Sequence, residues 1–448
     1  MTKPNPRRRR HYAGWLSRRL WRRRLVFWLG AIAVGLLSVI FAEAANWSQA
    51  AFAIGVAQIW WLPFAVTPLG FLVCAYLART FFPGSQGSGI PQAIAARHLR
   101  SSADRAFLLS PKLIVAKIGL TVLGLLMGAS VGREGPTVQV GAAIMLEVAS
   151  WGGLRHARGL ILTGSAAGIA AAFNTPLAGI VFAIEEMSRS FEQRTNGLVL
   201  YAVIIAALIS LGLVGNYSYF GFVTAAQMGA RDWGMVLACG VVGGLAGGLF
   251  SRLLFEGSRL ARRWTSTSPR SRSLSTAFVC GLIVAIVGVY TDGATFGTGY
   301  EQARSAVEGH ALASIFWPAK FVATIATALS GIPGGIFAPS LAVGAGLGGW
   351  LGTLAGTSGS GLAAVLGMAG YFAGVVQAPM TAFVIILEMT GNGANVIPLM
   401  VAAAIGFGTS KLVAPEPLYH ALANGFIQDA CDQVEAANAN GEKQQQTR

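Results

Sequence analysis

The sequence predicts an all-α membrane protein that crosses the bilayer many times. Of its 448 residues, 54% are hydrophobic and 11% are charged, which is too apolar for a soluble protein, and the chain is too long for a single anchor. Apolar runs follow one another from residue 25 to residue 412, and we expect no soluble domain between them. A third observation is an internal repeat, with halves of about 25–215 and 231–425.

The two halves match at one constant offset of 203 residues, which holds without a gap from Lys117 to Glu185. The offset holds for lysine, glycine, proline and glutamate, which a chance alignment of apolar residues does not explain. Paired halves with broken helices are typical of transporters that bind a solute near the midplane, and inversion of one half is the expected arrangement. The matched pairs include Lys117 with Lys320, Gly132 with Gly335, Pro136 with Pro339, Pro176 with Pro379 and Glu185 with Glu388.

Many apolar runs are too short to cross a bilayer as straight helices. Runs 137–150, 176–187 and 379–390 each hold fewer than 15 residues, whereas a full crossing needs about 20. Glycine occupies 58 positions, about twice its usual frequency, which fits close helix packing and interrupted helices. We therefore expect broken and re-entrant helices within one transmembrane domain at residues 25–425.

The net charge of +15 is concentrated in two places. Residues 1–24 hold a dense run of arginines before the first apolar run, and residues 252–272 hold six arginines and one acid. Basic flanks of membrane segments usually lie in the cytoplasm, so both regions are expected there. The run from Leu25 to Ala45 is too long for a signal peptide. No folded module accompanies the basic run, so nucleic acid is not an expected partner.

The remaining composition points away from metal and enzyme chemistry. The four cysteines and five histidines form no CxxC or HExxH pattern, so we expect buried free thiols, no metal and no cofactor. An enzyme acting on anionic lipid is a weaker alternative, because no nucleophile–base pair stands out. Residues 426–448 are polar and are expected to form a frayed C-terminal tail.

One charged stretch interrupts the apolar run that begins at Leu109. It reads Gly-Arg-Glu-Gly-Pro at 132–136. A glutamate inside lipid costs about 3 kcal/mol, and non-helical backbone is tolerated there only beside protein or water. Pro136 suits the first turn of a new helix, so Glu134 is expected at a helix N-terminus, where either its carboxylate or a competing anion is favoured. A structural Arg133–Glu134 pair is the alternative.

Three further loops lead into helices whose starts carry glycine or proline, at 87–91, 335–339 and 417–419. Converging helix N-termini would bind a small anion without a full positive charge, so that the ion could leave again. Ser88 and Tyr419 each offer a hydroxyl donor to such a site. Alternatively, Ser88 caps its helix and Tyr419 is an anchor at the membrane surface.

Two adjacent acids end the short run that begins at Pro176. Glu185 and Glu186 lie about 15 Å from that helix start, and the charged residues after them place this end near water. They form either an ordinary interfacial pair or a proton port on the side opposite Glu134. Lys117 and Lys320 are expected to snorkel to the interface or to bias the local potential.

Together these motifs resemble those of the CLC family of chloride channels and proton–chloride antiporters. GSGIP at 87–91, GREGP at 132–136 and GGIFAPS at 334–340 resemble the three anion-site signatures of that family. Segment 171–187 resembles the helix that leads to its internal glutamate, and PLY at 417–419 matches the position of its pore tyrosine. The resemblance spans residues 25–425 and implies a homodimer with an independent anion pathway in each subunit.

The resemblance also implies roles for single residues. Glu134 would be the gating glutamate, whose deprotonated side chain occupies an anion position and whose protonated form swings away. The hydroxyls of Ser88 and Tyr419 would contact the central ion. Glu186 would be the internal proton glutamate, supported by Glu185. The remaining chloride contacts would come from the backbone near Arg133, Glu134, Gly135, Gly335, Ile336 and Phe337.

The implied function is exchange of protons for chloride. Many channels of the family lack an acid at the position of Glu186, so its presence favours an antiporter, and a passive voltage- or pH-gated chloride channel is the alternative. Ser88 favours chloride, because relatives that prefer nitrate tend to carry proline there. Chloride, protons and lipid are the expected partners. A multi-pass protein of the inner or plasma membrane, with its N-terminus in the cytoplasm, is the expected location.

Overall fold

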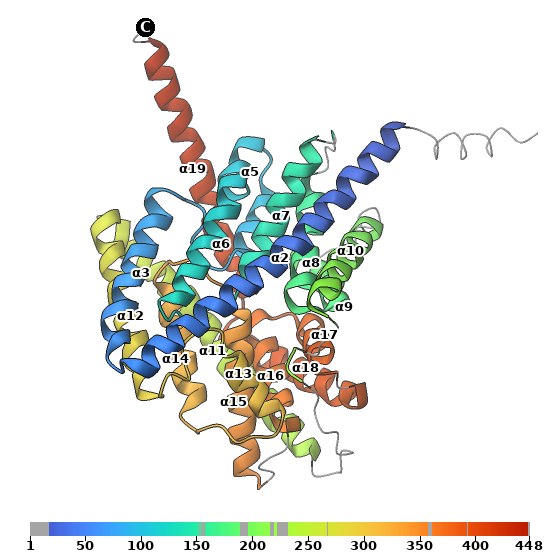
Figure 1. Cartoon of the computed structure of the whole chain (residues 1–448), viewed down its shortest axis with the longest axis vertical. Coiled ribbons are helices and arrows are strands. Elements are labelled where there is room, and N and C mark those ends of the chain that lie inside the picture. The colour runs from blue at the N-terminus through green and yellow to red at the C-terminus, as the bar shows by residue number, and fades with distance from the viewer. Residues whose placement is uncertain are drawn as a thin grey trace, which may run out of the picture.

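The computed structural model is a bundle of helices (Figure 1). It describes residues 18–151, 153, 157–188, 196–215, 219–221, 232–266, 268–356, 361–391 and 393–446. The arginines at 7–10 and the charged segment 189–195 lie outside the described residues. Within those ranges there is no β-strand, only two isolated bridges, so the predicted all-α class is confirmed.

The helices follow the two predicted halves in chain order. The first half holds α2 (Arg18–Gln58), α3 (Leu62–Thr80), α4 (Ile90–His98), α5 (Ser102–Leu108), α6 (Pro111–Leu126), α7 (Glu134–Trp151), α8 (Ala157–Phe173), α9 (Pro176–Phe182), the π-helical turn η1 (Ala183–Ser188) and α10 (Asn196–Val214). The second half holds α11 (Asp232–Ser266), α12 (Pro269–Tyr290), α13 (Tyr300–Val307), α14 (Phe316–Leu329), α15 (Phe337–Leu354), α16 (Gly361–Val376), α17 (Pro379–Thr390), the 3-10 turn η2 (Gly393–Asn395), α18 (Val396–Val413) and α19 (Leu418–Gln446).

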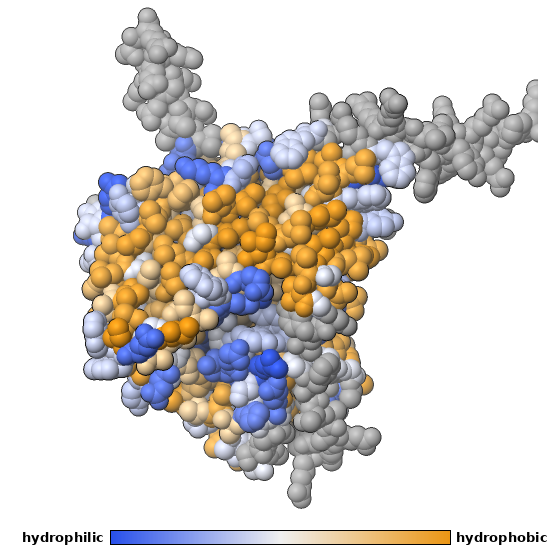
Figure 2. Space-filling view, in the orientation of Figure 1, coloured by the Kyte–Doolittle hydropathy of each residue, from blue (hydrophilic) through white to orange (hydrophobic). Residues whose placement is uncertain are grey.

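The surface of the bundle fits a lipid environment. Among the described helices, seven are long and apolar enough to cross a membrane. The outer face is largely apolar, and a hollow with hydrophilic residues interrupts it below α2 (Figure 2). Shorter apolar helices, including α8, α16 and α17, fill the interior, as the short runs predicted. Large side chains such as Leu29, Ile40 and Leu208 are exposed on the outer face of single helices, where lipid would cover them.

The two halves are inverted relative to one another. The loops before α7 and α15 meet at Gly132 and Gly335, which exchange two backbone hydrogen bonds of 2.7 Å each. These residues are equivalent under the 203-residue offset, so a two-fold relation carries each onto the other. From this meeting point α7 extends toward the end of the molecule that holds α5, and α15 extends toward the opposite end (Figure 1). The prediction of an inverted repeat is therefore confirmed.

Small residues allow the helices to approach closely. A Cβ added to Gly374 of α16 would lie 3.0 Å from the Cα of Gly244 on α11, so neither position has room for a side chain. Cys74, Cys239 and Cys280 are buried free thiols, as expected, and Cys431 is a free thiol that is half-buried.

One expectation was wrong, and one of the two alternatives for the buried lysines is excluded. The polar C-terminal segment is not frayed but continues α19 to Gln446, and its many Ala, Glu, Gln and Lys residues favour a helix. Lys117 and Lys320 do not snorkel, because both side chains are fully buried.

Candidate functional site

Three of the predicted loops meet at the centre of the molecule. Gly87 accepts a backbone hydrogen bond from Gly334 at 3.1 Å and donates one to Ile332 at 3.2 Å. The Gly132–Gly335 pair joins the second loop to the third. The helices that follow begin at Ile90, Glu134 and Phe337, as the motifs predicted. Their N-terminal N–H groups, which have no acceptor within a helix, are therefore gathered in one region.

Glycine is required where these loops touch. Gly89 has a φ of +102°, which L side chains rarely adopt, and a Cβ there would lie 2.7 Å from the Gly135 carbonyl oxygen. A Cβ on Gly135 would press against the hydroxyl of Ser88 and lie 3.2 Å from the Cα of Gly335. The glycines in the three signatures therefore bring three backbones into contact at membrane depth.

The Glu134 carboxylate lies inside this junction. The residue is fully buried, and a Cβ on Gly132 would collide with its Oε2 atom. The backbone N–H groups of Glu134 and Ala338 face the carboxylate, but neither oxygen makes a hydrogen bond of normal geometry to the protein. The carboxylate thus occupies a position where N–H groups from α7 and α15 favour negative charge.

The alternative of a structural Arg133–Glu134 pair is not what the structure shows. Arg133 directs its Nη1 atom to the side-chain oxygen of Asn46 at 3.4 Å and lines the hydrophilic hollow. That hollow has a volume of about 1130 Å³ and is bordered by α2 and by the start of α13. Arg133 therefore lines the hollow, and the next residue in the chain, Glu134, lies in the junction behind it.

The two predicted hydroxyls lie close to one another and near Glu134. Ser88 is not the cap of α4, because Gly89 is its N-cap and donates to the Gln92 side chain at 3.0 Å. Tyr419 is not a surface anchor, because it is fully buried. The two hydroxyls face one another, yet neither forms a protein hydrogen bond of normal geometry. Both can therefore turn toward an ion placed between them.

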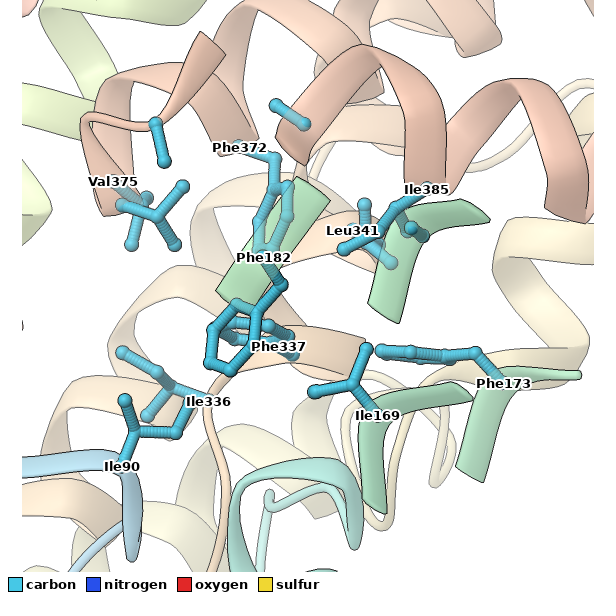
Figure 3. Close-up of a cluster of buried hydrophobic side chains, with 14 of the residues drawn as sticks. Ile90, Ile169, Phe173, Phe182, Ile336, Phe337, Leu341, Phe372, Val375 and Ile385 are labelled. Carbon is cyan, nitrogen blue, oxygen red and sulfur yellow. The ribbon is translucent and has the colours of Figure 1, made fainter. Parts of the chain in front are cut away.

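Aromatic side chains fix the backbone of this site from behind. Figure 3 shows Phe337 at the centre of the apolar cluster, with Phe173, Phe182 and Phe372 around it. Its ring centroid lies 4.8 Å from that of Phe372 and 5.8 Å from that of Tyr419. Ile336 and Phe337 are buried as well, so the first turn of α15 is held in place by packing on one side while its N–H groups face the junction.

Gly335 differs from the other predicted chloride contacts. Its N–H group is already donated to the Gly132 carbonyl at 2.7 Å, so it shapes the junction instead of offering a donor to an ion. Arg133, Gly135, Ile336 and Phe337 do lie around the junction, at the starts of α7 and α15.

Glu186 lies near Tyr419. Its side chain is 1% exposed, and the Tyr419 hydroxyl interacts electrostatically with Glu186 and with Glu134. The residue lies in the π-helical turn η1. Such turns are rare in proteins overall, and those that occur are often found at functional sites. An ordinary interfacial pair would be exposed to water, and Glu186 is not. Tyr419 thus lies between two buried acids.

Glu185 points elsewhere. Its carboxylate accepts hydrogen bonds from the backbone N–H groups of Met380 at 3.1 Å and Thr381 at 2.6 Å, at the start of α17. Glu388, the equivalent residue of the other half, does the same for Leu177 at 3.0 Å and Ala178 at 2.7 Å, at the start of α9. Each half therefore caps a helix of the other half. The sequence offset paired these acids, but it did not reveal the exchange.

The two buried lysines support the loops. Lys117 donates to the carbonyl oxygens of Ser85 at 2.7 Å and Gly87 at 2.6 Å, directly before Ser88. Lys320 donates in the same way to Thr295 at 2.9 Å and Gly297 at 2.7 Å. These bonds tie the loops at 85–87 and 295–297 to α6 and α14, whereas snorkelling would have carried both ammonium groups away from these loops.

The comparisons with known proteins agree with this geometry. Residues 69–411 match the family described as voltage gated chloride channel. The chain is 31% identical over 407 residues to an H(+)/Cl(-) exchange transporter, ClcA, of Citrobacter koseri, covering 86% of this chain and 84% of that protein. It is 30% identical over 429 residues to ClcA of Salmonella gallinarum, covering 90% of this chain and 89% of that protein.

Solved structures share the fold. A slow cyanobacterial Cl-/H+ antiporter superposes with a TM-score of 0.78 at 24% identity, covering 91% of this chain and 98% of that one. A eukaryotic CLC transporter superposes with a TM-score of 0.73 at 20% identity, covering 90% of this chain and 74% of that one. By its sequence match over most of its length, this chain belongs to the CLC family of chloride channels and transporters.

Proposed function

We propose that this chain exchanges protons for chloride across a cell membrane. The observation that carries the proposal is the line of groups from Glu134 past Ser88 and Tyr419 to Glu186, in which two buried acids flank two hydroxyls with no protein partner of normal geometry. Buried acids in a membrane are expensive and commonly mark proton routes. The names of the ClcA relatives, which describe exchange transporters, support the same function.

In this mechanism Glu134 and chloride compete for one place. The N–H groups at the starts of α7 and α15 favour a single negative charge there. An ionised Glu134 fills the place and excludes the ion, whereas a protonated Glu134 is no longer held by the N–H groups and leaves it open. Proton and anion binding are thereby linked with opposite sign. The carboxylate is well placed to take its proton from the hydrophilic hollow beside Arg133.

The binding of chloride relies on dipoles. Hydroxyls of Ser88 and Tyr419 and backbone N–H groups near Glu134, Gly135 and Phe337 supply partial positive charge. A lysine or arginine in direct contact would hold the ion too tightly for rapid release. Lys117 is buried close by but is bonded to loop carbonyls, which keeps its charge one layer away from the ion.

The distribution of basic residues supports an orientation in the membrane, and the family resemblance supports a homodimer. The start of α2, the α11–α12 connection and α19 lie at one end of the molecule (Figure 1), and Arg262 of α11 pairs with Asp429 of α19 at 3.3 Å. This end carries the basic residues, so it faces the cytoplasm by the positive-inside rule. Glu186 then serves the cytoplasmic side and Glu134 the outer side. A homodimer in the inner or plasma membrane is the proposed assembly.

A passive chloride channel on the same fold is the second candidate, because the anion site alone would conduct.

The test compares proton and chloride flux in liposomes for the wild type and Glu134→Gln. Under the proposal, Glu134→Gln keeps chloride flux and loses proton flux, because an amide cannot carry the proton. Proton flux that persists in this variant would overturn the role of Glu134.

A further inference from the structure

A small pocket lies on the basic end of the molecule, next to the inner acid. It has a volume of about 280 Å³ and lies between α4 and the start of α19. Its titratable lining residues are His98, Glu416 and His420, and the remaining lining is mostly apolar. The pocket has room for several water molecules and has polar partners for them.

One side chain of this lining also contacts Glu186. The Nε2 atom of His420 lies 3.0 Å from the backbone carbonyl oxygen of Glu186 and 4.0 Å from its Oε1 atom. The His420 side chain is 24% exposed, whereas that of Glu186 is 1% exposed. His420 therefore stands between the pocket and an acid that has almost no contact with solvent of its own.

We propose that His420 carries protons between water in this pocket and Glu186. The inference rests on the proposed exchange function and adds the residue that connects the inner acid to the cytoplasm. Imidazole is suited to the task because it ordinarily titrates near pH ~6.5 and has two nitrogens that point in different directions. A buried carboxylate without such a group would depend on rare penetration of water.

The transfer balances in protons and charge. A carbonyl can only accept, so the 3.0 Å contact requires a proton on Nε2, which leaves Nδ1 as the basic nitrogen of the neutral ring. A hydronium ion in the pocket gives a proton to Nδ1 and becomes water, and the ring becomes an imidazolium. The Nε2 proton then passes to Oε1 of Glu186 after a side-chain movement of about 1 Å, which brings the 4.0 Å separation to hydrogen-bond length. The neutral ring then carries its proton on Nδ1, and it returns to the starting tautomer when Nδ1 gives that proton to water and Nε2, turned toward the pocket, takes one up, with no net change in protons.

The other charged groups around the start of α19 are engaged elsewhere or line the pocket. Arg97 donates to the Met187 carbonyl, which places a cation beside η1. Arg105 donates to the Leu99 carbonyl at 2.7 Å. The groups on the elements packed here are Glu186 on η1, Arg97 and His98 on α4, Asp104 and Arg105 on α5, Arg262 on α11, and Glu416, His420 and Asp429 on the chain around the start of α19.

The test variant is His420→Gln, since glutamine keeps an N–H donor near the Glu186 carbonyl but does not titrate. The matched control is His98→Gln, because His98 lines the same pocket but bonds only its own helix, through Nδ1 to the Ile94 carbonyl at 2.9 Å. Each protein is placed in liposomes, and proton and chloride flux are measured over a series of pH values on the pocket side.

We expect His420→Gln to lower proton flux at least ~10-fold, with chloride flux within about twofold of the wild type, and to flatten the pH dependence of the proton rate. His98→Gln is expected to behave as the wild type. Added imidazole should restore proton flux in His420→Ala, since the emptied pocket can hold it.

The outcomes separate this inference from the proposed function. Wild-type liposomes that move no protons against a gradient would overturn both. A coupled wild type with an equally coupled His420→Gln would overturn the inference alone. A His420→Ala variant that loses proton flux and is not rescued by imidazole would make His420 a structural residue, which also overturns it.

Discussion

The exchange of helix caps between the halves predicts a measurable loss of stability when it is broken. Glu185 accepts two backbone hydrogen bonds at the start of α17, and Glu388 accepts two at the start of α9. The perturbation is Glu185→Ala, Glu388→Ala and the double variant. Each substitution leaves two N–H groups of a helix start without a protein acceptor and removes a negative charge from the positive end of the helix dipole.

The magnitude follows from the bonds that are lost. A hydrogen bond to a charged group contributes about 1.5–3 kcal/mol, and water compensates in part because one of the two bonds at each cap is exposed. We therefore expect each alanine variant to lower the free energy of unfolding by about 2 kcal/mol. The double variant should lose about 4 kcal/mol if the caps act independently. Glu185→Gln should lose about half as much as alanine, because its amide oxygen can still accept.

The assay is unfolding in detergent followed by far-ultraviolet circular dichroism. The control is Glu256→Ala, because Glu256 only forms an exposed pair with Arg259 within α11 and should change stability by no more than about 0.5 kcal/mol. The reasoning is refuted if Glu185→Ala and Glu388→Ala are as stable as this control. It is also refuted if only one of these two alanine variants lowers the free energy of unfolding, since the two-fold relation makes the caps equivalent.

Further predictions concern the transport site. Glu186→Gln should keep chloride flux and abolish proton flux in liposomes, and unchanged coupling would leave Glu186 as a structural residue. Tyr419→Phe should weaken chloride binding by about 1 kcal/mol, roughly fivefold in Kd, as measured by calorimetry, because a donor with no protein partner of normal geometry is removed. Gly132→Ala should displace the Glu134 carboxylate and so raise chloride flux while lowering the proton-to-chloride ratio. Gly119→Ala is its control, since a Cβ there meets nothing within 4 Å.

Much of the site was visible in the sequence because its chemistry is local. The helix starts at Ile90, Glu134 and Phe337 follow from glycine and proline at fixed positions, and those positions fix backbone conformation directly. The repeat was equally visible, because a constant offset of lysine, proline and glutamate needs no knowledge of the fold. The inverted relation was only expected from the usual layout of such transporters, because the offset itself does not distinguish inverted from parallel halves.

The features that the sequence did not reveal are contacts between distant segments. Nothing local separates Glu185 from Glu186, yet one caps α17 and the other lies beside Tyr419. Both glutamates lie in the π-helical turn, whose geometry sets the direction of each side chain, and such a turn has no clear sequence signature. Lys117 looked like a residue that would snorkel, because the loop carbonyls that bind it come from 30 residues away along the chain. The helical C-terminal segment was missed because polarity was taken as a sign of disorder.

The central claim is that one pathway carries both ions, and proton movement driven by chloride tests it most directly. Purified wild-type protein in sealed liposomes is given a chloride gradient with the membrane voltage clamped and no proton gradient, and internal pH is followed. The account predicts that protons move against chloride and build up a pH difference, and that Glu134→Gln abolishes this movement. Chloride flux in the wild type with no change in internal pH would contradict the account and would identify a passive channel.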